Sequence, residues 1–79
     1  MKKDIILKYV GGADNAIRVI EVIEQYGGAY QEDTEDKVMS VEVMKKPEVI
    51  RRGMPLKEAM FLIRKLKEIG ADAGFVDGE

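Results

Sequence analysis

Residues 53–70 read Gly-Met-Pro-Leu-Lys-Glu-Ala-Met-Phe-Leu-Ile-Arg-Lys-Leu-Lys-Glu-Ile-Gly and carry the clearest secondary-structure signal of the chain. Pro55 suits the start of a helix because its φ is preset near the helical value and its missing N–H would be unpaired there anyway. Gly70 can adopt the left-handed conformation that closes a helix. Between them, apolar residues recur at helical spacing and predict one broad face that covers a hydrophobic core. The residues of this face are Leu56, Ala59, Met60, Leu62, Ile63, Leu66 and Ile69.

Phe61 is the large apolar residue that falls outside this face. Helical geometry places it among Lys57, Lys65 and Glu68, opposite the apolar arc. Two explanations are open. The aliphatic stems of Lys57, Arg64 and Lys65 cover the ring, or the ring anchors a contact with a second copy or another protein. In both cases Phe61 lies outside the core, so we expect Phe61→Ala to cost the monomer less than about 1 kcal/mol, as at an ordinary surface site.

The length and composition predict a single non-catalytic domain that spans residues 1–79. The chain has no cysteine and no histidine. These absences exclude disulfides, thiolate or imidazole metal sites, and Ser–His or Cys–His catalysis. No other pair of side chains makes a convincing acid–base or nucleophilic site. We therefore expect a protein that is not an enzyme and that holds no metal and no cofactor.

The charge pattern narrows the class of partner. No apolar run approaches the roughly 18 residues that a membrane-spanning helix needs, and residues 1–10 do not read as a signal peptide, so we expect a cytoplasmic protein without a membrane partner. The formal charge of −2 argues against nucleic-acid binding. Acidic residues concentrate in residues 31–44 and basic residues in residues 45–67. Charged residues on solvent-exposed surfaces explain this uneven distribution, and the basic segment could also attract an acidic partner. The 35% charged content resembles heat-adapted compositions.

The remaining elements are predicted from short local patterns. Residues 4–10 form a run of apolar and β-branched residues that predicts a strand. Residues 48–52 predict a short edge strand and residues 72–77 a closing strand. A helix is predicted from about residue 15 to residue 26, with Asp14 as its N-cap and two glycines as its stop.

The helix of residues 15–26 has an apolar arc of about 220°, which is wider than one sheet covers. Ile17 and Ile20 extend this arc until it meets Glu21 and Glu24. We therefore expect part of this apolar arc to pack against another element of the fold or against a partner, in addition to the sheet. These four residues are the predicted interaction face.

Residues 29–46 allow two interpretations. Alternation of Met39, Val41 and Val43 favours a strand. Acidic and capping residues at the start of the segment, with lysines and a proline at its end, favour a helix. Two α+β folds follow. One is a βααβαβ sandwich of helices on a small antiparallel sheet, with residues 34–46 helical, and the other is a βαββαβ ferredoxin-like plait in which residues 29–33 and 37–44 pair as a hairpin.

Two long runs resemble the C-terminal domain of the bacterial ribosomal stalk protein. Residues 5–28 begin with its Ile6-Leu7-Lys8 strand motif and Gly12-Ala13 turn, and continue as its first helix without a gap. Residues 47–76 follow its last strand–helix–strand pattern, again without a gap. The resemblance does not extend to the middle of the chain, between these two runs, where this chain is longer than the family around Ala29–Asp33. It favours the βααβαβ fold.

The resemblance also implies a function. The stalk domain recruits translational GTPases through its first two helices, with apolar and basic residues on the first. Its apolar positions match Ile17 and Ile20, whereas Glu21 and Glu24 stand where the family has basic residues. The reversed charge implies a basic partner. The adaptor that delivers N-degron substrates to the Clp protease shares this fold, but its amine-binding residues have no match here.

Together these observations predict a small protein-binding module with a basic protein partner, or a second copy of the chain as partner. The predicted partner-binding residues are Ile17, Ile20, Glu21, Glu24 and Phe61. The alternative is a ferredoxin-like regulatory domain that binds a small ligand at its turns. A helix at residues 34–46 would favour the module, and a strand would favour the regulatory domain.

Overall fold

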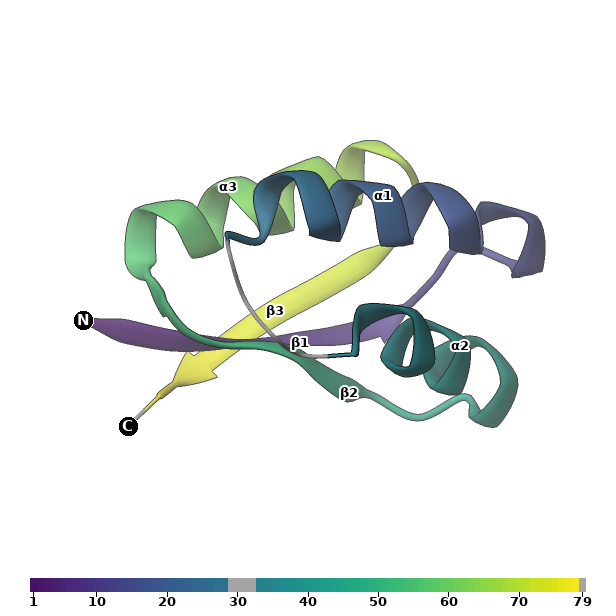
Figure 1. Ribbon diagram of the computed structural model, residues 1–79, viewed down its shortest axis with the longest axis horizontal. Helices are drawn as coiled ribbons and strands as arrows, with labels where there is room; N and C mark the ends of the chain where they lie inside the picture. Colours follow the sequence, from purple (N-terminus) through teal and green to yellow (C-terminus); the bar gives the residue numbers. More distant parts are fainter. Residues whose placement is uncertain (29–32, 79) are drawn as a thin grey trace.

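The computed structural model of this chain describes residues 1–28 and 33–78. Three helices pack on a three-stranded antiparallel sheet, so the predicted βααβαβ order is confirmed (Figure 1). No helix in these two ranges is long and apolar enough to cross a membrane. The elements are β1 (Lys2–Tyr9), the short 3-10 helix η1 (Ala13–Asn15), α1 (Ala16–Tyr26), α2 (Thr34–Met44), β2 (Glu48–Pro55), α3 (Leu56–Glu68) and β3 (Asp72–Asp77).

The sheet has the strand order β2-β1-β3, with β1 in the centre and antiparallel to both neighbours. Ile5 lies between Arg51 of β2 and Phe75 of β3 in this register. Alternate residues of β1 are buried on the face that the helices cover. β2 is an edge strand, as predicted, and it extends three residues further than predicted, to Pro55.

Residues 34–44 form helix α2, so the ferredoxin-like plait is the wrong alternative. Its proposed hairpin also included residues 29–32, which lie outside the described residues. The side chain of Asp33 accepts a hydrogen bond from the backbone N–H of Asp36 at 3.2 Å and caps the helix. Lys45, with φ 57°, ends the helix in the left-handed conformation. The capping signals therefore outweighed the β-propensity of the valines.

The start of α1 differs from the prediction. Asp14 is not the N-cap, because it lies inside η1, and Asn15 occupies the N-cap position. The helix prediction at residues 53–70 is confirmed at both ends: Leu56 is the first helical residue after Pro55, and Gly70 has φ +92°.

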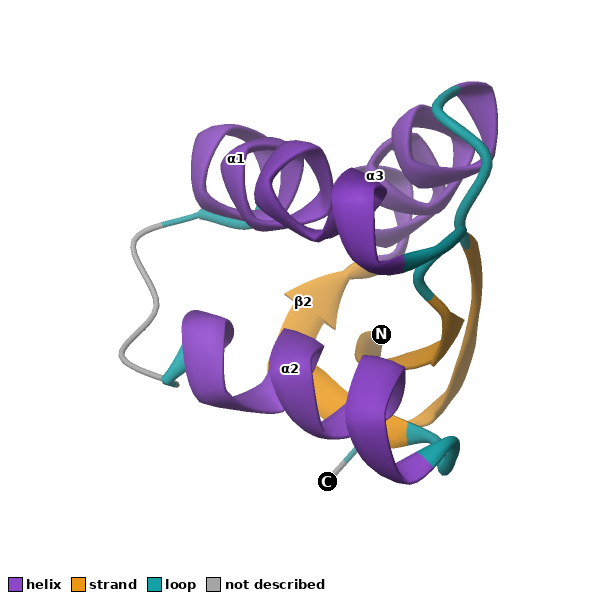
Figure 2. Ribbon diagram, turned by 90° about the vertical axis from the view of Figure 1, so that its right-hand side faces the viewer, coloured by secondary structure: helices purple, strands orange, loops and turns teal. Residues whose placement is uncertain are grey.

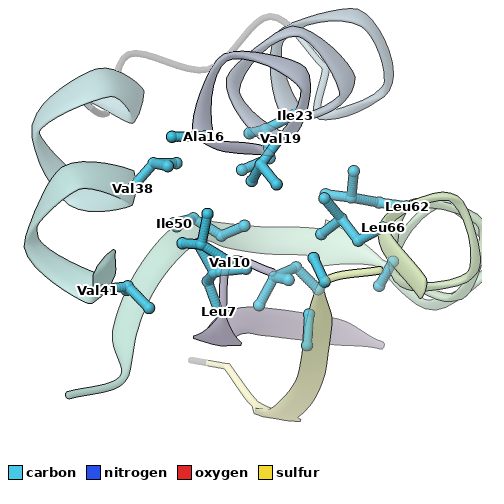
Figure 3. Close-up of a cluster of buried hydrophobic side chains, with 14 of the residues drawn as sticks. Leu7, Val10, Ala16, Val19, Ile23, Val38, Val41, Ile50, Leu62 and Leu66 are labelled. Atoms are coloured by element: carbon cyan, nitrogen blue, oxygen red, sulfur yellow. The ribbon is translucent and has the colours of Figure 1, made fainter. Parts of the chain in front are cut away.

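The core lies between the sheet and all three helices. α1 contacts both α2 and α3, and Figure 2 shows α1 beside α3 with α2 below them. The side chains of Val19 and Ile23 on α1 point toward those of Val38 on α2 and Leu62 on α3 (Figure 3). Part of the wide apolar arc of α1 is therefore covered by two other helices.

The buried Arg51 of β2 ties the end of α1 to the start of α2. Its Nε donates to the carbonyl of Gly27 at 3.1 Å, and its Nη1 donates to Thr34 Oγ1 at 2.8 Å and to the carbonyl of Ile50 at 2.7 Å. A Cβ on Gly27 would clash with the carbonyl oxygen of Ile23 and would lie 2.7 Å from Arg51 Nε, so this position requires glycine. Arg51 is 2% exposed and is a structural residue rather than part of the basic surface.

Candidate functional site

The four predicted residues on α1 lie on one side of the helix, and we call them together the α1 face. Ile17 is 70% exposed, although it is a large aliphatic residue. Ile20 is half-buried and packs against the core. Glu21 and Glu24 are exposed beside them. The α1 face is therefore an apolar strip with carboxylates at one end, spaced i, i+3, i+4 and i+7 along the helix.

Side chain–backbone hydrogen bonds hold α1 in place at both ends. At its start, Asn15 Nδ2 donates to the carbonyl of Val10 at 2.8 Å and to the carbonyl of Ile69 at 2.9 Å. At its end, Arg51 donates to the carbonyl of Gly27. The sequence did not reveal this role of Asn15, because one of its two partners lies 54 residues away. Both ends of the helix that carries the α1 face are therefore fixed to other elements.

The outer side of α3 carries a hollow of about 460 Å³, which we call the α3 groove. Met60 is 55% exposed there, so its predicted place in the core is wrong. The buried arc of α3 is narrower than predicted, and Met60 lies about 100° around the helix from the buried Ala59. The groove is lined by Lys57, Met60, Phe61 and Arg64.

The charged groups of two neighbouring side chains lie near the Phe61 ring, whereas the first of the two explanations had the aliphatic stems over it. The guanidinium of Arg64 lies 5.3 Å from the ring centroid, and Lys65 Nζ lies 5.2 Å from it. The sequence did not predict a third contact: Tyr26 of α1 packs edge-on against Phe61, with ring centroids 5.3 Å apart and an interplanar angle of 75°. Phe61 still keeps 38% of its surface exposed in the groove.

The contact with Tyr26 raises the expected cost of Phe61→Ala from less than about 1 kcal/mol to about 1–2 kcal/mol of unfolding free energy, because an edge-to-face aromatic pair adds about 0.5–1.5 kcal/mol to the small cost of an exposed site. Truncation of a core phenylalanine costs about 3–5 kcal/mol. Urea unfolding followed by circular dichroism measures the difference. A loss in the core range would mean that Phe61 is packed as a core residue.

The five predicted residues do not form one site. Tyr26, at the end of α1, contacts Phe61. Ile17 precedes Tyr26 by nine residues, which corresponds to about 13.5 Å along the helix axis and to a half-turn around it. The α1 face therefore points away from the α3 groove, and the chain has two separate candidate surfaces, one acidic and one basic.

Three carboxyl groups with shifted pKa values lie outside both surfaces. The hydrogen bond with Asp33 and the charge of Asp33 raise the pKa of Asp36. The hydrogen bond from Ser40 Oγ, at 2.8 Å, lowers the pKa of Glu48. The hydrogen bond from Lys3 and its charge lower the pKa of Asp77. Each shift arises from a contact within the fold.

Residues 1–28 and 33–78 contain no group of three or more acidic side chains placed to hold a metal ion. No protein-family model, curated protein or solved structure matches this chain significantly. The two surfaces and the residues that position them are therefore the basis on which a function is proposed.

Proposed function

We propose that this protein is a non-catalytic protein-binding module and that its α1 face binds a basic protein partner in the cytoplasm. The observation that carries the proposal is Ile17, which stays 70% exposed on a helix whose other apolar residues are buried or half-buried. A single exposed aliphatic residue is ordinary on a protein surface. Here it continues into Ile20 and lies beside two carboxylates on a helix that is fixed at both ends.

The resemblance to the ribosomal stalk domain supports the same surface. In that family the corresponding helix contacts protein factors through apolar residues at the positions of Ile17 and Ile20. The observed element order agrees with that fold. Because Glu21 and Glu24 replace basic residues of the family, the partner of this chain would carry the opposite charge to theirs.

The apolar residues and the carboxylates of the α1 face would contribute to binding in different ways. Burial of the exposed surface of Ile17 would contribute roughly 1–2 kcal/mol of binding free energy. Glu21 and Glu24 would mainly speed up association with a basic partner and discriminate against an acidic one. The small-ligand alternative assumed a ferredoxin-like plait, which is not the fold of this chain.

A charge-reversal experiment tests whether the partner that binds the α1 face is positively charged. The wild-type protein, Glu24→Lys and Glu58→Lys are each immobilised and exposed to lysate of the source cells at low and at physiological salt. We expect the wild type to capture basic proteins more slowly as salt rises, because exposed charges are screened within about 10 Å at 0.1 M salt. Glu24→Lys should lose this capture. Glu58→Lys, the same change at an exposed position on α3, should retain it.

Capture that is indifferent to ionic strength would contradict a basic partner. Equal losses in Glu24→Lys and Glu58→Lys would also contradict it, since only the first variant changes the α1 face.

A further inference from the structure

The two candidate surfaces carry opposite charges and share the same helical spacing. The α1 face consists of two apolar residues followed by two carboxylates. The α3 groove consists of two exposed apolar residues between two cations. Both sets occupy positions i, i+3, i+4 and i+7 of a helix, so both form a single stripe about 10 Å long on one side of it.

We propose that the α3 groove of one copy of this chain receives the α1 face of a second copy. This inference rests on the proposed function of the α1 face, and it takes the basic α3 groove of a second copy, a chain of net charge −2, as the basic surface that the α1 face binds. The two surfaces cannot meet within one molecule, because Tyr26 already packs against Phe61 and Ile17 lies on the opposite side of the same helix. The contact is therefore between two copies.

The pattern of charges defines two alignments of the paired helices. In an antiparallel alignment Glu24 of one copy lies opposite Lys57 of the other, and in a parallel alignment it lies opposite Arg64. In both alignments Ile20 packs against the apolar middle of the groove, which Met60 and Phe61 form. Ile17 then lies beside the remaining cation and contacts its aliphatic stem, and Glu21 lies at the margin of the apolar middle. The guanidinium of Arg64 lies 5.3 Å from the centroid of the Phe61 ring, beside the apolar middle of the groove.

The contact joins two different surfaces, so it is heterologous. Repeated heterologous contacts form a closed ring if the rotation between successive copies brings the last copy back to the first, and otherwise they form open chains. One helix against one groove buries less than the roughly 1,200 Å² of a standard interface. We therefore expect weak, concentration-dependent association, with a dissociation constant of roughly 10–500 µM.

Sedimentation velocity of the whole chain tests the inference at protein concentrations from about 10 µM to about 1 mM, a range that brackets this affinity. The weight-average mass of the wild type should rise above the 8.9 kDa of the monomer with concentration, and the rise should weaken at high salt. Glu24→Lys should associate at least about tenfold more weakly, because it sets like charges against each other. Lys67→Glu, an exposed position on α3 outside the groove, should associate like the wild type.

Charge exchange identifies the partner of Glu24. Lys57→Glu and Arg64→Glu are each tested alone and mixed in equal amounts with Glu24→Lys. The mixture with the true partner restores association, since one contact keeps the wild-type pair and the other carries the exchanged pair. Rescue by Lys57→Glu indicates the antiparallel alignment, and rescue by Arg64→Glu indicates the parallel one. Unchanged circular dichroism spectra show that each variant is folded.

Three results would overturn the inference: a wild-type chain that stays monomeric up to about 1 mM, far above the expected dissociation constant; association that Glu24→Lys leaves unchanged; or no rescue in either mixture. None of them would overturn the proposed function. A monomeric wild type whose lysate capture depends on Glu24 would leave the α1 face as a binding surface for a different protein.

Discussion

Arg51→Met should lower the free energy of unfolding by about 3 kcal/mol, because it removes hydrogen bonds from a buried charged donor, each of which contributes about 1.5–3 kcal/mol. Methionine keeps most of the length of the side chain, so the change tests the hydrogen bonds more than the packed volume. The carbonyl of Gly27 and the hydroxyl of Thr34 would remain at a buried site without this donor. The neighbouring Arg52→Met is the matched control.

Arg52 is exposed, and its Nη1 lies 3.6 Å from a carboxylate oxygen of Asp4. An exposed ion pair contributes about 0–1 kcal/mol, so we expect only a small loss in Arg52→Met. Urea unfolding measures both variants. A domain of this length has an unfolding free energy of roughly 4–12 kcal/mol, so the loss in Arg51→Met would clearly lower the urea concentration at the midpoint of unfolding. Equal midpoints for the two variants would show that Arg51 does not hold the connection between α1 and α2.

The local elements of the fold follow from short sequence patterns. Residues 53–70 contain a starting proline, an apolar face and a closing glycine, and α3 forms there as predicted. α2 is different, because its valines and its capping residues pointed to opposite structures. Val38 and Val41 are buried, while Val43 on the far side of the helix is 70% exposed. Such a helix has no focused apolar face for a sequence pattern to detect.

Contacts between distant residues were the part that the sequence did not reveal. Arg51 bonds to partners 24 and 17 residues away, and nothing in its own segment distinguishes it from the exposed Arg52. The pairing of Tyr26 with Phe61 depends on how α1 lies beside α3 (Figure 2). Met60 is exposed because α3 buries a narrower arc than its apolar residues span.

The exposure of Ile17 could be anticipated for a simple reason. The apolar arc of α1 is wider than a sheet can cover, and even two neighbouring helices leave its margin open. The width of an arc can be read from the sequence, whereas the identity of the residues that cover it cannot.

Ile17→Asp compared with Val43→Asp is the most direct test of the protein-binding function. Both residues are 70% exposed aliphatic side chains on helices, so the two changes introduce the same charge at equal exposure. We expect each variant to keep its stability within about 1 kcal/mol, because a new carboxylate is favoured near the start of α1 and disfavoured near the end of α2 by about 0.3–1 kcal/mol. The variants test different surfaces, since Ile17 belongs to the α1 face and Val43 lies on the outer side of α2.

Quantitative mass spectrometry of the proteins that each immobilised variant captures from source-cell lysate gives the result. An interface change that costs 2 kcal/mol or more weakens binding about 30-fold, so Ile17→Asp should lose the partner that the wild type and Val43→Asp both retain. Retention of that partner by a folded Ile17→Asp would contradict the assignment of the α1 face, and an unfolded Ile17→Asp would place Ile17 in the core.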